Sequence, residues 1–178
     1  MKKTKFTILF FLCAFSSFSQ LDFGANKKYS REDSLRGNLS EYRSCYNVIR
    51  YDLDIKVDIE NRFISGSNTI KFLAENDFQM MQIDLFSNMK IEKIVSENKE
   101  LLFKRDCNAV FVSFPETILK GKEKSIVVYY SGNPTKAKNA PWDGGFSWDK
   151  DKDGNPFVGV SCQGTGASLW WPCKDNQT

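Results

Sequence analysis

The stretch YDLDIKVDI, residues 51–59, alternates apolar and polar side chains without a fault. Successive side chains of a β-strand point to opposite faces, so this stretch predicts a strand with one apolar and one polar face. The apolar face would hold Tyr51, Leu53, Ile55, Val57 and Ile59, and the polar face Asp52, Asp54, Lys56 and Asp58. Asn61 and Arg62 predict a turn, and residues 63–74 read as the returning strand. Residues 46–74 therefore predict an antiparallel strand pair.

The chain beyond this pair continues the β pattern. Shorter strands are predicted at 80–86, 90–96, 100–104, 109–114 and 124–131, separated by short polar turns. No convincing helical period lies between them. This spacing is typical of an antiparallel sandwich or of layered sheets, and it predicts an all-β fold.

The chain before this pair divides into two segments. Residues 20–45 are polar and predict an N-terminal extension with one short helix, which Ser30 would cap and Gly37 would end. Residues 1–19 carry lysines followed by an apolar run, and small residues precede Gln20, so a signal peptide cleaved before Gln20 is expected. The apolar run of about 13 residues is shorter than the ~20 that cross a bilayer, although an uncleaved anchor is the alternative. We expect an exported protein, periplasmic or extracellular, without a transmembrane segment after cleavage.

The charge balance argues against nucleic-acid binding. The chain has 25 Lys and Arg against 22 Asp and Glu, and residues 1–19 contain three lysines and no acid. Without that leader the count is 25 − 3 = 22 against 22, so no basic excess remains to neutralise phosphates.

The chain contains no histidine, which excludes imidazole-based nucleophilic sites and His-based zinc sites within it. Four cysteines follow the leader, namely Cys45, Cys107, Cys162 and Cys173. Export permits disulfides, and four cysteines allow three complete pairings, but free or partly paired structural cysteines are the favoured interpretation. Their spacing matches no zinc pattern.

Residues 132–178 gather all four tryptophans among many glycines, which predicts closely packed loops. Asp149–Gly154 resembles the start of a calcium loop, but its twelfth position, which needs a Glu, is Val160. A polar hairpin tip between two strands is favoured instead. Further on, Gln163 precedes Gly164, Thr165, Gly166 and Ala167. From the spacing alone, the favoured interpretation is a tight turn in which Gln163 satisfies nearby backbone groups. The alternative is that its amide, which has a donor and an acceptor, holds a peptide backbone or an amine.

Three stretches resemble the M1 zinc aminopeptidases, a family that includes leukotriene A4 hydrolase: residues 46–59 followed by 64–67, residues 142–148 and residues 163–175. The resemblance covers about residues 30–178 and implies a saddle-like, mostly antiparallel N-terminal β-domain over residues 46–178. It also implies that Gln163 reaches the active-site cleft and helps hold the N-terminus of a peptide substrate, with Gly164, Thr165, Gly166 and Ala167 along the same edge.

The family's Gly-Ala-Met-Glu-Asn and His-Glu-x-x-His motifs are absent from the chain. The resemblance therefore implies that zinc and the catalytic residues belong to a catalytic domain beyond Thr178, and that these 178 residues alone are inactive and bind no metal. A domain parted from such a partner should expose apolar surface around Phe146, Trp170 and Trp171. The alternative is a non-catalytic, exported β-sandwich that binds a glycan or a protein through Trp142, Trp148, Trp170 and Trp171.

Overall fold

The computed structural model describes residues 28–37 and 39–176, so the expected signal peptide lies outside the described residues. Every element below belongs to one compact unit that begins at Arg31. Two short helices, α2 (Arg31–Gly37) and α3 (Glu41–Ser44), precede the strands. The helix predicted between Ser30 and Gly37 is α2. No helix among the described residues has the length and apolar character needed to cross a membrane.

The rest of the described chain contains ten strands and one 3-10 helix, joined by turns and loops. They are β1 (Tyr46–Asp58), β2 (Phe63–Ala74), β3 (Phe78–Asp84), β4 (Met89–Ser96), β5 (Lys99–Glu100), β6 (Leu102–Asp106), β7 (Ala109–Ile118), β8 (Glu123–Gly132), β9 (Gly145–Lys150), β10 (Pro156–Ser161) and η2 (Ala167–Leu169).

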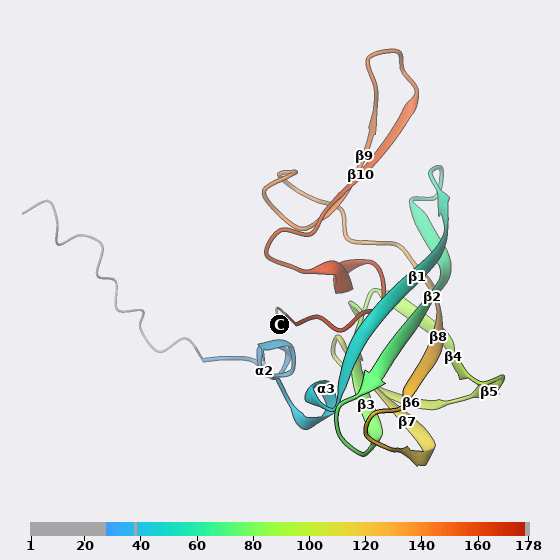
Figure 1. The fold of residues 1–178 in the computed structure, drawn as a ribbon. Coiled ribbons are helices and arrows are strands. Elements are labelled where there is room, and N and C mark those ends of the chain that lie inside the picture. Colours follow the sequence, from blue (N-terminus) through green and yellow to red (C-terminus); the bar gives the residue numbers. More distant parts are fainter. Residues whose placement is uncertain (1–27, 38, 177–178) are drawn as a thin grey trace, which may run out of the picture. The chain divides into compact units, whose positions relative to one another are not determined.

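The strands form three sheets in which all the paired neighbours are antiparallel (Figure 1). One sheet has the order β1-β2-β8-β4-β5, a second has the order β3-β7-β6, and β9 and β10 form a hairpin. The predicted all-β class with mostly antiparallel, layered sheets is confirmed.

Most predicted strands differ from the observed ones only at their ends, but the one predicted at 100–104 is split. The Leu101 side chain is 5% exposed, and its backbone N–H donates to the Ile94 carbonyl at 2.8 Å. Leu101 therefore leaves the strand path to enter the core, with β5 on one side and β6 on the other.

The hydrophobic core lies between the five-stranded and three-stranded sheets. Ile70 and Phe72 of β2 and Val128 of β8 contribute from the first sheet, and Ile83 of β3 and Val112 of β7 from the second; all five are fully buried. Alternating inward-facing side chains from two stacked sheets are the usual composition of such a core.

The apolar face of β1 is only partly covered. Its register with β2 places Leu53 opposite Asn68 and Val57 opposite Ile64, on the face of the sheet that turns toward the core. Yet Leu53 and Val57 remain 42% and 44% exposed. The alternation predicted which side chains share a face, but not that this face extends beyond the part of the core that covers it.

Replacing Phe72 by Ala tests the position of the core. Phe72 is fully buried, and its ring packs against Tyr46 at a centroid distance of 5.6 Å, so we expect Phe72→Ala to lower the free energy of unfolding by about 3–5 kcal/mol. Leu102, which is 82% exposed, provides the control, and Leu102→Ala should change stability by less than about 0.5 kcal/mol. Urea unfolding followed by circular dichroism measures both, and equal losses would contradict this core.

Candidate functional site

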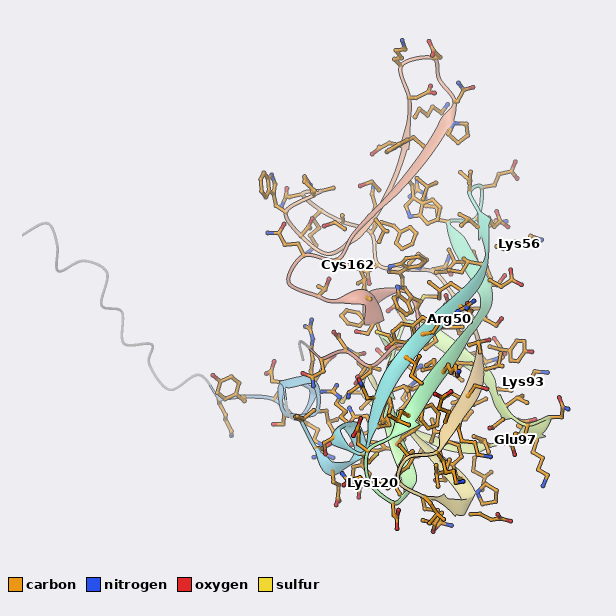
Figure 2. All side chains as sticks on the ribbon, viewed as in Figure 1. Arg50, Lys56, Lys93, Glu97, Lys120 and Cys162 are labelled. Atoms are coloured by element: carbon orange, nitrogen blue, oxygen red, sulfur yellow. The ribbon has the colours of Figure 1, made fainter. Side chains whose placement is uncertain are left out.

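The turn that carries Gln163 is closed by its own backbone. The Cys162 carbonyl accepts hydrogen bonds from the N–H groups of Thr165 at 3.1 Å and Gly166 at 2.9 Å. Gln163 lies at the exposed tip, and its side chain forms no hydrogen bond with any described residue. Its amide donor and acceptor therefore both face solvent. Figure 2 labels Cys162, where the turn begins.

The two glycines of this turn have structural reasons for being glycine. Gly164 and Gly166 have φ angles of 70° and 77°, in the left-handed region that favours glycine. A Cβ at Gly166 would lie 2.4 Å from a carboxylate oxygen of Asp175, so no side chain fits there. The Gly164 carbonyl accepts a hydrogen bond from the Arg36 guanidinium at 3.1 Å, which ties the turn to α2.

A second loop packs directly against this turn. A Cβ at Gly144 would meet the Thr165 hydroxyl at 2.0 Å, so these two residues are in close contact. The Ser161 hydroxyl donates to the Pro141 carbonyl at 2.7 Å. Trp142 on this second loop is 76% exposed. The Thr165 hydroxyl is buried and has no hydrogen-bond partner among the described residues.

Behind the turn lies a chain of buried polar contacts. The Ser168 hydroxyl donates to the Asp175 carboxylate at 2.6 Å, and the Asp175 N–H donates to the Asp84 carboxylate at 3.2 Å. Arg43 of α3 donates to the other Asp84 oxygen at 2.6 Å. These contacts connect α3, the end of β3 and η2, and they fix the base of the Gln163 turn.

Arg43 and Asp84 form a buried ion pair, with side chains 1% and 5% exposed. Burial raises the pKa of the Asp84 carboxyl, and the Arg43 guanidinium and the Gln82 amide oppose that shift. The Gln82 amide also donates to Asp84, at 3.0 Å. The carboxylate is thus surrounded by donors, as a charge removed from water requires.

Residues 172–175 run as a strap across both sheets. Asp84 and Cys173 exchange two backbone hydrogen bonds of 2.7 and 3.0 Å, which attaches the strap to β3. On the side of the five-stranded sheet, the Asn68 amide donates to the Pro172 carbonyl at 2.7 Å, and the Lys174 N–H donates to the Tyr51 hydroxyl at 2.9 Å. Because the strap follows directly after η2, it holds the Gln163 turn against the rigid part of the domain.

Aromatic packing corrects the expectation of an exposed patch around Phe146, Trp170 and Trp171. Phe146 is 4% exposed and stacks on Trp148 at a centroid distance of 5.3 Å. Trp170 packs edge-on against Phe146, and Trp171 packs edge-on against Tyr51 at 4.9 Å. The chain covers these rings with its own hairpin and strap, and its exposed apolar side chains lie instead at positions such as Leu53, Val57 and Trp142.

The hairpin interpretation of Asp149–Gly154 is confirmed, because β9 and β10 pair on either side of it. The Asp151 carboxylate accepts from the backbone N–H groups of Asp153 at 2.9 Å and Asn155 at 2.8 Å, so it closes the tip of the hairpin. Within residues 28–37 and 39–176 there is no group of three or more His, Cys, Asp or Glu side chains placed to hold a metal ion.

All four cysteines of the described residues are free thiols. Cys45 and Cys173 are buried, and burial raises the pKa of the Cys45 thiol to about 11. Burial also raises the pKa of Cys173 well above its usual value. Because the thiolate is the reactive form, these two residues are structural rather than nucleophilic.

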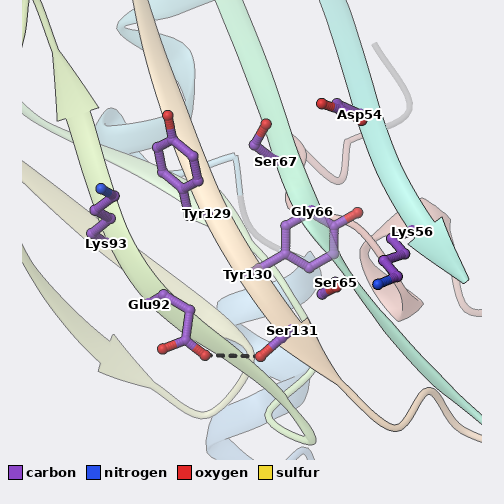
Figure 3. A pocket seen from close by; sticks show the side chains of 10 residues that line it. All are labelled: Asp54, Lys56, Ser65, Gly66, Ser67, Glu92, Lys93, Tyr129, Tyr130 and Ser131. Atoms are coloured by element: carbon purple, nitrogen blue, oxygen red, sulfur yellow. Dashed lines mark hydrogen bonds between the residues drawn. The ribbon is translucent and has the colours of Figure 1, made fainter. Parts of the chain in front are cut away.

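A separate depression of about 480 Å³ lies on the outer face of the five-stranded sheet (Figure 3). The small residues Ser65, Gly66 and Ser67 of β2 form its floor, between longer side chains on either side. On one side of the depression, the Ser131 hydroxyl donates a hydrogen bond to the Glu92 carboxylate at 2.8 Å. None of the residues predicted for the site lines this depression, and mixed polar side chains are what the solvent-facing side of an antiparallel sheet normally carries.

The five predicted site residues are consecutive and form one turn and the start of η2, in which Gln163 and Gly164 are exposed, whereas Thr165, Gly166 and Ala167 are half-buried. Sequence reasoning did not find the residues that hold this turn, namely Arg36, Arg43, Asp84 and Asp175. One signal in the sequence could have indicated Asp84. Gln82 and Asp84 alternate with the apolar residues Met81, Ile83 and Leu85, and all five are buried. A polar side chain in a strand that is buried on both faces needs a hydrogen-bond partner from elsewhere in the chain.

No family model matches the sequence, and no curated protein matches it. Solved structures do match in fold. The M1 zinc metallopeptidase from Deinococcus radiodurans, in a structure with a Tyr-Ser-Ala substrate, has 19% identity and a TM-score of 0.58, over 74% of this chain and 29% of that enzyme. Native leukotriene A4 hydrolase from Saccharomyces cerevisiae has 18% identity and a TM-score of 0.59, over 84% of this chain and 24% of that enzyme.

The chain thus spans less than a third of the length of these enzymes. At these identities the likeness concerns the fold: the chain has the fold of the N-terminal β-domain of M1 zinc metallopeptidases. The fold expected from the resemblance of residues 46–59 with 64–67, 142–148 and 163–175 is therefore confirmed.

Breaking the buried ion pair should be costly. Arg43→Met leaves the Asp84 carboxylate buried without its cation, so we expect a loss of about 3–5 kcal/mol in the free energy of unfolding. The matched control is Arg50→Met, because Arg50 pairs with Asp52 on the exposed face of β1 (Figure 2) and such pairs contribute about 0–1 kcal/mol.

Chemical denaturation measures this difference. The double variant Arg43→Met with Asp84→Met should be less destabilised than Arg43→Met alone, because no charge is then left unpaired in the interior. Equal losses for Arg43→Met and Arg50→Met would contradict the role given to the buried pair.

Proposed function

We propose that this chain is the substrate-edge domain of an exported zinc aminopeptidase, and that Gln163 helps hold the N-terminal end of a peptide substrate. The observation that carries the proposal is the state of Gln163: its amide faces solvent without a local partner, on a turn fixed to the rest of the domain. The shared fold with M1 zinc metallopeptidases supports the same family of functions.

The chemistry of Gln163 fits this role. Its side-chain carbonyl accepts hydrogen bonds from an amine or a peptide N–H, and its NH₂ group donates to a peptide carbonyl. A peptide N-terminus presents these groups within a few ångströms of one another. Because the turn is already fixed by Arg36 and by the contact of Gly166 with Asp175, little backbone order has to be gained on binding. Gly164, Thr165, Gly166 and Ala167 would continue the same edge.

The described residues do not fit a zinc site, because none of them form a group of three or more potential ligands and the sequence has no histidine. In this proposal the zinc ligands and the catalytic residues therefore belong to another part of a longer protein. The chain supplies an edge of the cleft, and its export, proposed from residues 1–19, would place that cleft outside the cytoplasm.

The competing proposal of a glycan-binding module receives less support. A sugar-binding platform needs aromatic rings with open faces, and Trp142 is the one tryptophan of the four that is exposed. Trp148, Trp170 and Trp171 are half-buried and pack against the core. A face built from several tryptophans is thus not formed within residues 39–176.

The first test is Gln163→Ala in the longer protein. Loss of one partner of a substrate hydrogen bond should reduce kcat/KM by an amount equivalent to about 1–3 kcal/mol. Zinc content should stay unchanged, and Gln163→Glu, which keeps an acceptor at this position, should retain more activity than Gln163→Ala. The control is Lys152→Ala at the exposed hairpin tip. Unaltered kinetics for Gln163→Ala would show that the amide holds no substrate.

The second test concerns the chain by itself. Purified residues 20–178 should hydrolyse no aminoacyl or peptide substrate and should bind no stoichiometric zinc, because the residues that these functions require are not among them. Chromogenic aminoacyl substrates and metal analysis after dialysis against zinc provide the measurements. Zinc-dependent turnover by this chain would overturn the proposed division of roles.

A further inference from the structure

A cavity of about 420 Å³ opens at the end of β7, and none of the residues of the proposed peptide site lines it. Its walls come from the β4–β5 hairpin, the last part of β7 and the turn that leads into β8. Figure 2 labels Glu97 at its rim and the nearby Lys120, both well away from Cys162 and the Gln163 turn. Its volume falls within the ~300–1,000 Å³ typical of small-molecule sites.

The cavity exists because neighbouring strands end at different points. β6 pairs with β7 only as far as Leu102 opposite Ser113, whereas β7 continues to Ile118. Residues 114–118 therefore have no strand on the β6 side within the described part of the chain. The space between this end of β7 and the β4–β5 hairpin is left open to solvent.

The floor of the cavity is the hydrophobic core itself. Leu101, Phe114 and Ile118 belong to the core and line the cavity. They are 5%, 6% and 7% exposed, whereas most core residues are fully buried, so these three side chains reach the surface at the cavity. The Phe114 ring packs against Phe72 and Phe78 at centroid distances of 6.3 and 5.9 Å. An apolar group entering the cavity would therefore contact the small parts of these core side chains that remain exposed.

The rim carries an excess of positive charge. Three lysines line it, Lys99, Lys122 and Lys124, against two carboxylates, Glu97 and Glu116. Lys124 is paired with Glu97, and Lys99 also lowers the pKa of the Glu97 carboxyl, whereas Lys122 and Glu116 form no ion pair with any described residue. The net charge of +1 at the rim favours an anionic ligand.

The wall that carries Lys122 is held in place from below. The Lys122 carbonyl accepts from the Ala74 N–H at 2.9 Å, and the Gly121 N–H donates to the Ala74 carbonyl at 2.8 Å. The Lys120 N–H donates to the Asp77 carboxylate at 2.7 Å. Two hydrogen bonds to the last residue of β2 and one to the β2–β3 connection thus fix the turn, so the cavity is formed before any ligand arrives.

From these features we infer that the cavity between β7 and the β4–β5 hairpin binds a small amphipathic carboxylate. The apolar body of the ligand lies on Leu101, Phe114 and Ile118, and its carboxylate lies at the rim beside Lys99 and Lys122. This site is separate from the proposed peptide edge and needs none of its residues.

Isothermal titration calorimetry on the purified chain tests the inference, with decanoate as the probe below its micelle concentration. Decanoate should bind saturably with one site per chain. Decylammonium has the same apolar tail with the opposite head charge, and acetate has the head without the tail, so both should bind much more weakly. Absence of saturable decanoate binding would refute the site, and so would equal binding of decylammonium.

A pair of charge-reversal variants tests the location. Lys122→Glu should weaken decanoate binding about tenfold, because it replaces an attractive charge at the rim with a repulsive one. Lys120→Glu makes the same change two residues away at a position that does not line the cavity, and it should stay within about twofold of wild type. Both lysines are exposed, so the variants should fold, as circular dichroism can verify.

Gln163→Ala should leave decanoate binding unchanged. This result separates failure of the carboxylate site from failure of the proposed peptide edge, since each has its own readout. Equal losses in Lys122→Glu and Lys120→Glu would place the ligand elsewhere and overturn the inference.

Discussion

The buried pair of Arg43 and Asp84 is the constraint on which the rest of the candidate site depends. A carboxylate removed from water is tolerable only when donors surround it, and here Arg43, Gln82 and the Asp175 N–H supply them. Those three donors come from α3, from β3 and from the strap of residues 172–175. Satisfying the hydrogen-bonding needs of one buried carboxylate therefore brings three separate segments to one point. Asp175 connects that point to Ser168 of η2, which follows the Gln163 turn.

The sequence predicted the local part of this architecture well. The period of two in residues 51–59 identified β1 and its apolar side, and glycine and polar turns marked most of the other strands. What it could not predict is which strands become neighbours: β2 pairs with β8, about fifty residues further along the chain, and β3 pairs with β7. The alternation of apolar and polar residues indicates that one face of a strand is buried, but it does not indicate which other strand pairs with it. For the same reason, the alternation did not predict that Leu53 and Val57 remain partly exposed.

The residues of the candidate site also differ in how far the sequence predicts them. Gln163 and its glycines stood out in the sequence, but their spacing alone favoured a tight turn, and the binding role expected of Gln163 came from the resemblance of residues 163–175 to the M1 zinc aminopeptidases. Arg43 was not found, since it lies in a polar segment where a charged residue ordinarily faces solvent. Its burial depends on Asp84, which is distant in sequence, and neither residue alone shows that it is paired. The contacts that support the site join residues that are distant in sequence, whereas the exposed turn is formed by consecutive residues. The supporting contacts are therefore harder to infer from the sequence.

The way this turn is built also bears on why its tip is available for binding. A turn needs its polar groups satisfied, and side chains of the Asn and Gln type often meet that need themselves. Here the Cys162 carbonyl accepts from Thr165 and Gly166, and the Gly164 carbonyl is taken by Arg36. Glycine at 164 and 166 permits the backbone angles that this closure requires. Because backbone groups and Arg36 close the turn, the Gln163 amide forms no hydrogen bond with the described residues, and an exposed amide of this kind can bind a ligand at no cost to the fold.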